Sequence, residues 1–180
     1  KNFYGGRGEK NTEKYRRNAQ SGKMRKAKIG RRTKETAISV ELYIDGKGRA
    51  KADMGIGFFN HMIETFAKTG LFDIKLSARG DMEIDQHHTV EDAGIALGQA
   101  FAQALGDKKG INRAGFFVYP MDEALAVAAV DLGGRPFLQY GAKFKRRFCG
   151  DFDTDLLEDF LQGFATNLKA NIVVRMPFGR

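Results

Sequence analysis

All three histidines of this 180-residue chain fall in one part of the sequence: His61, and then the adjacent pair His87 and His88. Glu91 follows His87 by four residues, so on a helix these two side chains project from the same face, while His88 points about a quarter turn away. Neutral imidazole together with carboxylate suits borderline first-row ions such as manganese, zinc or iron. The spacing therefore predicts a metal site, and one segment of chain could serve two ions.

The acidic neighbours of the histidine pair support this interpretation. Asp85 and Asp92 lie close in sequence, and we expect their carboxylates to accept hydrogen bonds from imidazole N–H groups. Adjacent histidines at a helix start also occur as capping or solvated surface residues, and the spacing names no reaction. A metal-dependent hydrolase could use the same residues.

Strand and helix periods alternate along the segment that carries these groups. Residues 36–45 alternate apolar and polar side chains, which predicts a strand. Apolar residues at three- and four-residue steps over 58–67 predict a helix that ends with Gly70 in the C′ position. A strand over 72–78 and an apolar-faced helix over 89–105 follow, so the histidine pair comes just before the second helix.

The pattern returns from Gly110 onward, with expected strands over 123–132 and 136–144, a helix over 153–168 and a strand over 171–176. A shift of 98 positions brings apolar residues of the first helix, and of the strand after it, onto apolar residues of the second half. We therefore predict a duplicated α+β sandwich in which helices cover one face of each sheet. The closing helix of the second copy is missing from this pattern.

The N-terminal part of the sequence differs in charge from the rest. Residues 1–32 hold 12 of the 30 Lys and Arg and two acids, with few apolar residues and no sustained period. We predict a basic disordered tail there, followed by half-domains at 33–109 and 110–180. A nucleic-acid-binding module is one alternative, because the tail is basic and small α+β sandwiches occur in ribosomal proteins; a solvated leader is the simpler interpretation.

Location is predicted from three features of the sequence. The tail lacks the apolar stretch of a signal peptide, and no apolar run approaches the length of a membrane span. The single Cys149 fits a reducing compartment. We expect a cytoplasmic protein with no membrane partner.

Five motifs, in a fixed order, extend the pattern well beyond the histidines. They are GFFNHM (57–62), GD followed by EIDQHHTVED (80–92), ALGDKKGINR (104–113), PMDEALA (120–126) and DLGGRP (131–136). In this order the chain resembles the imidazoleglycerol-phosphate dehydratases from about residue 32 to 180. The resemblance implies a lyase that dehydrates D-erythro-imidazole glycerol phosphate to imidazole acetol phosphate in histidine biosynthesis. It also implies half-domains that each have a mixed four-stranded sheet with two helices on one face, as in domain 2 of ribosomal protein S5.

The same resemblance implies a cofactor of two manganese ions. His61, His87, His88 and Glu91 match metal ligands of the family and are intact. Asp159 stands where the family commonly has a histidine in the duplicated helix, and a carboxylate can still bind manganese. The predicted metal set is therefore His61, His87, His88, Glu91 and Asp159.

Roles toward the substrate also follow from the resemblance. Glu35 matches a family acid at the substrate, and Glu35 and Glu91 are the expected catalytic carboxylates. Arg113 and Arg135 match phosphate-binding arginines, a role that suits the guanidinium fork; without the resemblance each is an ordinary surface cation. The expected substrate-binding set is Glu35, His61, His87, His88, Arg113 and Arg135.

The last expectations concern the assembly of the protein and the positions where its sequence differs from the family pattern. The resemblance implies a homo-oligomer, a 24-mer in the family, with active sites between subunits. Asn60 replaces the aspartate that usually precedes the first histidine. The family pattern continues into a second HHxxE and a lysine, whereas this sequence ends at Arg180. We therefore expect a C-terminally truncated member with impaired activity, and a non-catalytic remnant is the alternative.

Overall fold

The computed structural model describes residues 24–179. The elements in chain order are β1 (Lys26–Arg32), β2 (Thr36–Tyr43), β3 (Ala50–Asp53), α2 (Gly57–Gly70), β4 (Asp73–Gly80), α3 (His87–Leu105), β5 (Ala114–Met121), β6 (Ala124–Asp131), β7 (Phe137–Gly141), β8 (Phe148–Cys149), β9 (Phe152–Asp153), α4 (Leu156–Leu168) and β10 (Asn171–Phe178).

Two four-stranded sheets share one topology. The first has the order β1-β2-β4-β3 and the second β5-β6-β10-β7. In each sheet the first three strands in this order pair antiparallel and the last pair is parallel. The predicted duplication is therefore confirmed strand by strand.

The two copies differ in one connection. β6 begins 88 positions after β2, whereas β10 begins 98 positions after β4. The extra length lies between β7 and α4, where the short β8–β9 hairpin is inserted. A single shift of 98 therefore aligns the helix and last strand of each copy, and the first strands need a smaller one.

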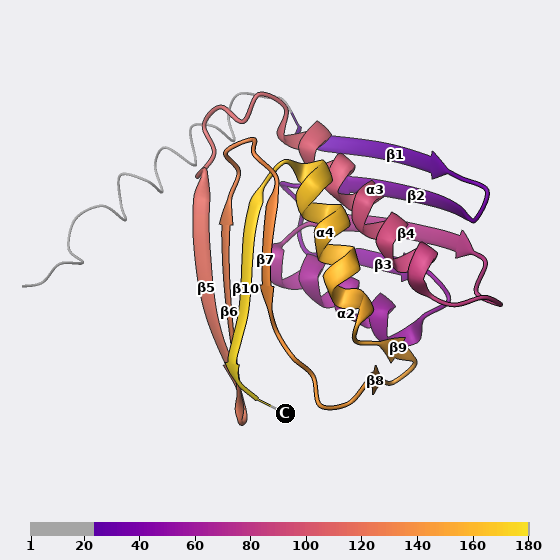
Figure 1. The fold of residues 1–180 in the computed structure, drawn as a ribbon. Helices are drawn as coiled ribbons and strands as arrows, with labels where there is room; N and C mark the ends of the chain where they lie inside the picture. The colour runs from indigo at the N-terminus through magenta and orange to yellow at the C-terminus, as the bar shows by residue number, and fades with distance from the viewer. Residues whose placement is uncertain (1–23, 180) are drawn as a thin grey trace, which may run out of the picture.

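Helices α3 and α4 form a layer between the two sheets (Figure 1). α3 packs on β1 and β2, α2 packs on β3 and β4, and α4 packs on α3 and β7. The predicted α+β sandwich is confirmed. Among the described residues, α2 and α3 belong to the first copy and α4 to the second.

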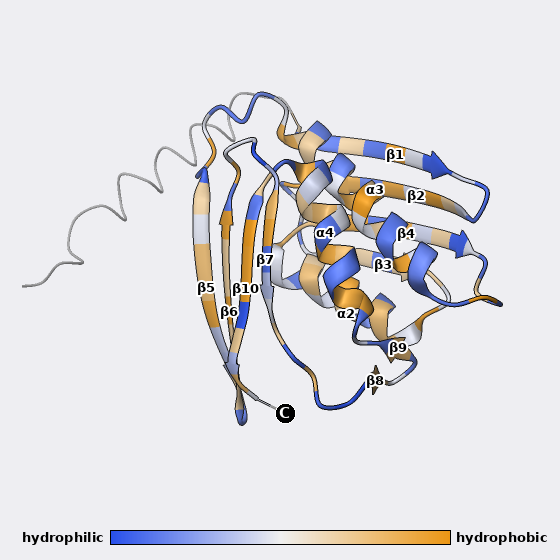
Figure 2. Cartoon of the chain, viewed as in Figure 1, coloured by the Kyte–Doolittle hydropathy of each residue, from blue (hydrophilic) through white to orange (hydrophobic). Residues whose placement is uncertain are grey.

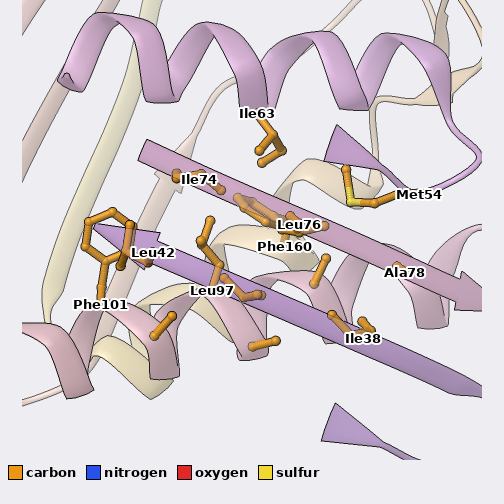
Figure 3. Packing of buried hydrophobic residues seen from close by; sticks show 14 of the residues in the cluster. Ile38, Leu42, Met54, Ile63, Ile74, Leu76, Ala78, Leu97, Phe101 and Phe160 are labelled. Carbon is orange, nitrogen blue, oxygen red and sulfur yellow. The ribbon is translucent and has the colours of Figure 1, made fainter. Parts of the chain in front are cut away.

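One apolar core joins both copies. Leu42, Leu76 and Leu97 are almost completely buried where β2, β4 and α3 meet (Figure 3). Each such side chain contributes roughly 1.5–3 kcal/mol relative to an exposed one. Phe160 of α4 lies in the same cluster, so the second half-domain is anchored in the core of the first.

Two glycines allow α3 and α4 to approach closely. Gly94 and Gly98 are one helical turn apart on α3, and a Cβ on them would come within 2.2 Å of the Phe160 carbonyl oxygen and 2.6 Å of the Phe164 carbonyl oxygen. Only hydrogen fits at this distance. The crossing fixes the first turns of α4 beside the first turns of α3, where the histidine pair lies.

Residues 26–32 correct the predicted boundary of the tail. They form β1, which pairs with β2 along its whole length, and Ala27 is buried in the core. Basic residues mask the strand in the sequence, because Lys26 and Lys28 lie on the exposed side and only two aliphatic residues alternate with them. The first half-domain therefore begins at Lys26, not at residue 33. The predicted disorder of residues 1–23 lies outside the described residues.

The end of α2 corrects a smaller expectation. Gly70 is the last helical residue, and Leu71 takes the left-handed conformation, with φ 57°. The Phe72 ring explains the glycine, because a Cβ on Gly70 would lie 2.3 Å from that ring. Close packing, not backbone conformation, requires glycine here.

A carboxylate of the inserted hairpin caps α2. Asp151 accepts hydrogen bonds from the N–H groups of Gly57 (2.6 Å) and Phe58 (2.8 Å), which have no partner within the helix. These two backbone bonds lower the pKa of Asp151. The side chain of Gln86 donates to the Asp151 carbonyl oxygen (2.5 Å) and accepts from the Asp153 N–H (3.3 Å), so the hairpin also holds the residue before His87.

We expect Asp151→Asn to make the protein less stable at neutral pH, by about 1 kcal/mol for an exposed helix cap. Because the folded pKa is lowered, the charged cap contributes above the unfolded pKa of about 3.9, and this contribution is lost as the pH falls through the folded value. Urea unfolding at pH 7 and in acid should show the difference between the proteins shrinking in acid. Asp122→Asn, in the β5–β6 turn, is the control; an equal difference at both pH values would contradict the capping role.

Candidate metal and phosphate sites

Asp85 and Asp81 set the start of α3. The Asp85 carboxylate accepts the His87 N–H (2.8 Å) and so caps the helix, which corrects its expected role as an acceptor for imidazole. Asp81, directly after β4, lies 3.0 Å from His88 Nδ1. Sequence analysis missed Asp81 as a partner, although it belongs to the GD motif.

The contact with Asp81 has the largest influence on the pKa of His88. The hydrogen bond to Asp81 raises the pKa of His88, and the charges of Asp81, Glu35 and Asp85 add to this effect, while partial burial opposes it. In the neutral tautomer that carries its proton on Nδ1, His88 donates to Asp81 and leaves the Nε2 lone pair free, which is the arrangement that carboxylate partners give to metal-binding histidines.

His87 faces two carboxylates from two helices. Its Nε2 lies 3.9 Å from Glu91 Oε2 on α3 and 3.9 Å from Asp159 Oδ2 on α4. All three side chains are about two-fifths exposed, and the rings of His87 and His88 are 5.6 Å apart. The close crossing of α3 and α4 therefore brings together residues that lie far apart in sequence.

Imidazole and carboxylate are donor types that suit Mn²⁺. His61 is exposed on α2. Within residues 24–179, no three His, Cys, Asp or Glu side chains are grouped so that they could hold an ion. The donor types of His87, Glu91 and Asp159 therefore fit this ion, whereas their spacing in the described chain does not form a closed group around one point.

Glu35 lies at the same end of α3. It is exposed in the turn between β1 and β2, and its charge contributes to the raised pKa of His88. The Glu35 carboxylate therefore lies within electrostatic reach of His88.

The two predicted phosphate ligands share one end of the second sheet. Arg113 donates from Nε and Nη2 to the two carboxylate oxygens of Asp131, at 2.6 and 2.8 Å. This bond lowers the pKa of Asp131, and the charge of Arg135 lowers it further. The Arg135 carbonyl oxygen accepts from Asn171 (2.6 Å). The Asp131 carboxylate is therefore paired with Arg113 and lies within electrostatic reach of Arg135.

The arginines and the histidines lie at opposite ends of α3. His87 opens this 19-residue helix, which is about 28 Å long at 1.5 Å per residue. Beyond its C-terminal end, Lys108 binds the Leu132 carbonyl oxygen (3.0 Å), and the Leu132 N–H binds the Arg113 carbonyl oxygen (2.9 Å). Figure 1 shows α3 leading to the connection that enters β5. A small phosphate ester cannot span this distance within one chain.

Within residues 24–179, none of the helices combines the length and apolarity needed to cross a bilayer.

Comparisons with known proteins agree with these features. The family described as Imidazoleglycerol-phosphate dehydratase matches residues 54–180. The imidazoleglycerol-phosphate dehydratase of Koribacter versatilis is 55% identical over 157 residues, which cover 87% of this chain and 80% of that protein. The same enzyme of Thermoanaerobacter pseudethanolicus is 53% identical over 156 residues, with the same coverage of each chain. The crystal structure of the dehydratase from Staphylococcus aureus superposes with a TM-score of 0.73 at 31% identity and covers 86% of each chain. The chain therefore belongs to the imidazoleglycerol-phosphate dehydratase family, lyases of histidine biosynthesis.

Proposed function

We propose that this chain dehydrates D-erythro-imidazole glycerol phosphate to imidazole acetol phosphate, with two manganese ions held at the His87–His88 end of α3. The observation that carries the assignment of this site is the approach of His87 to both Glu91 and Asp159, at 3.9 Å each. His61, His87, His88, Glu91 and Asp159 are the proposed ligands. The bound metal supplies Lewis acidity that stabilises negative charge on the imidazole of the substrate.

The proton transfers fall to carboxylates of this chain. Glu35 is exposed to solvent and its charge reaches His88, so we assign it proton transfer, with Glu91 as the second carboxylate. A correctly positioned general acid or base typically raises the reaction rate by roughly 10²- to 10⁴-fold. Arg113 and Arg135 are assigned to the phosphate.

We also propose a homo-oligomer with active sites between subunits. The separation of the arginines from the histidines along α3 supports this, because a substrate could touch both sets only where two chains meet. The apolar residues of β5 give a second argument: the large side chains from Phe116 to Tyr119 are about half to four-fifths exposed. Figure 2 shows hydrophobic residues along β5, β6 and β10, and patches of this kind mark interaction sites.

The proposed location is the cytoplasm. Cys149 is free and exposed on β8, which suits a compartment that keeps thiols reduced.

The test is dehydration of the substrate by the purified chain with Mn²⁺, followed by mass spectrometry as the loss of one water. Turnover that EDTA abolishes and added Mn²⁺ restores would support the proposed reaction and its metal requirement. Hydrolysis of phosphate esters without dehydration would favour a metal-dependent hydrolase instead. Mn²⁺ binding without any reaction would favour the non-catalytic alternative.

A further inference from the structure

Asp92 is a buried carboxylate directly after the proposed ligand Glu91. It is 8% exposed and has two partners outside its own helix. Arg31 of β1 donates from Nε (2.9 Å) and Nη2 (2.7 Å) to Oδ1, and Thr36 of β2 donates from its hydroxyl to Oδ2 (2.5 Å). These contacts correct the expectation that Asp92 would accept from imidazole. They tie the start of α3 to both strands that flank Glu35.

Thr33 and Thr36 build the turn that carries Glu35. The Thr33 hydroxyl accepts the N–H groups of Glu35 (3.1 Å) and Thr36 (2.9 Å), and the Thr33 N–H donates to the Thr36 carbonyl oxygen (2.9 Å). The two hydroxyls also lie 3.2 Å apart. A continuous chain of hydrogen bonds therefore runs from the backbone of Glu35 through Thr33 and Thr36 to Asp92.

We propose that Asp92, with Arg31 and Thr36, is a positioning cluster that holds the Glu35 carboxylate at the histidine end of α3. The inference rests on the proposed role of Glu35 in proton transfer. Thr33 links the Thr36 hydroxyl of this cluster to the Glu35 N–H, and the Glu35 residue stays exposed. Its members are therefore positioning residues, not catalytic ones.

The chemistry of the cluster favours positioning over stability. Removing both charges of a buried ion pair from water costs free energy. Apolar side chains of similar volume often stabilise a fold equally well. Hydrogen bonds differ from apolar contacts in being directional. Three bonds on one carboxylate fix the angle and register of the β1–β2 turn on α3. A misplacement of about 1 Å at a reacting group can cost about 10²-fold in rate.

The experiment replaces the Thr36 hydroxyl with a methyl group, which keeps the shape of the side chain nearly unchanged. Thr36→Val should lower kcat by between about tenfold and a hundredfold and leave KM and the Mn²⁺ affinity, measured by calorimetry, within about twofold. Thr36→Ser should restore kcat. The decisive comparison repeats Thr36→Val in the Glu35→Gln background, where we expect no further loss, because the hydroxyl acts through Glu35.

A second readout does not depend on activity. Hydrogen exchange of the amides of Glu35 and Thr36 should be faster in Thr36→Val and normal in Thr36→Ser. The matched control is Lys28→Gln with Glu41→Gln, which removes an ion pair between the same two strands and should change neither kcat nor this exchange. If Thr36→Val does not fold, Arg31→Lys, which keeps the charge and loses the fork, takes its place.

Four results would overturn the proposed positioning cluster. Equal losses from Thr36→Val in both backgrounds, or unchanged amide exchange, would overturn the positioning cluster while the role of Glu35 stands. A Glu35→Gln protein with undiminished kcat would overturn both the cluster and the proposed role of Glu35. Loss of Mn²⁺ affinity in Thr36→Val would show that the cluster supports the metal ligands instead.

Discussion

Mixing two inactive variants should restore dehydration that neither shows alone. One variant is His87→Ala, which removes the imidazole that faces Glu91 and Asp159. The other is Arg113→Ala with Arg135→Ala, which removes both guanidinium groups at the far end of α3. If each site takes its histidines from one subunit and its arginines from another, mixed assemblies contain intact sites.

Random mixing in equal amounts should recover about a quarter of the unsubstituted activity, since one site in four pairs an intact histidine set with an intact arginine set. The variants are unfolded together, refolded together and assayed with Mn²⁺ against each variant refolded alone. The matched control mixes His87→Ala with Glu91→Ala, which lie 3.9 Å apart in one chain and should not complement. Recovery only in the control, or in neither mixture, would contradict sites shared between subunits.

Phe59→Ala should destabilise the fold by about 3–5 kcal/mol, the usual cost of removing a buried phenylalanine. The Phe59 side chain is 2% exposed and lies between two rings of the second half-domain. It stacks on Phe152 with ring centroids 4.9 Å apart and meets Phe160 edge-on at 5.1 Å. The loss should appear in urea unfolding as a lower midpoint.

Phe58→Ala is the control for this substitution. The Phe58 ring is only partly buried and lies 6.4 Å from Phe152, so we expect a loss of about 1 kcal/mol. Equal losses for the two variants would show that Phe59 does not join the half-domains.

The sequence predicts well what short spacing determines. His87 and Glu91 are four residues apart, and helix geometry alone places them on one face. The duplication is also visible in the sequence, because α2 and α4 repeat the same apolar period, and the last strand of each copy lies a constant distance further on.

Contacts between segments that are distant in the sequence cannot be predicted from local spacing. Arg31 and Asp92 are 61 positions apart, and no local pattern indicates that they pair. The acidic residues near the histidines were therefore assigned to the nearest imidazole, whereas Asp85 caps the helix and Asp92 binds the strands. The charged side chains of β1 hide its alternation, so the sequence alone predicts a tail over these residues. The untested assignments, above all the manganese ligands, stay predictions.

The cap on α2 also has a consequence for the order in which the chain acquires structure. The N–H groups of Gly57 and Phe58 are satisfied by Asp151, more than 90 residues later in the sequence. During synthesis the first half-domain therefore waits for the second before its own first helix is complete. Contacts of such sequence separation slow folding and favour a late, cooperative step. The duplicated halves should consequently fold as one unit, and neither should be recovered as an independent domain.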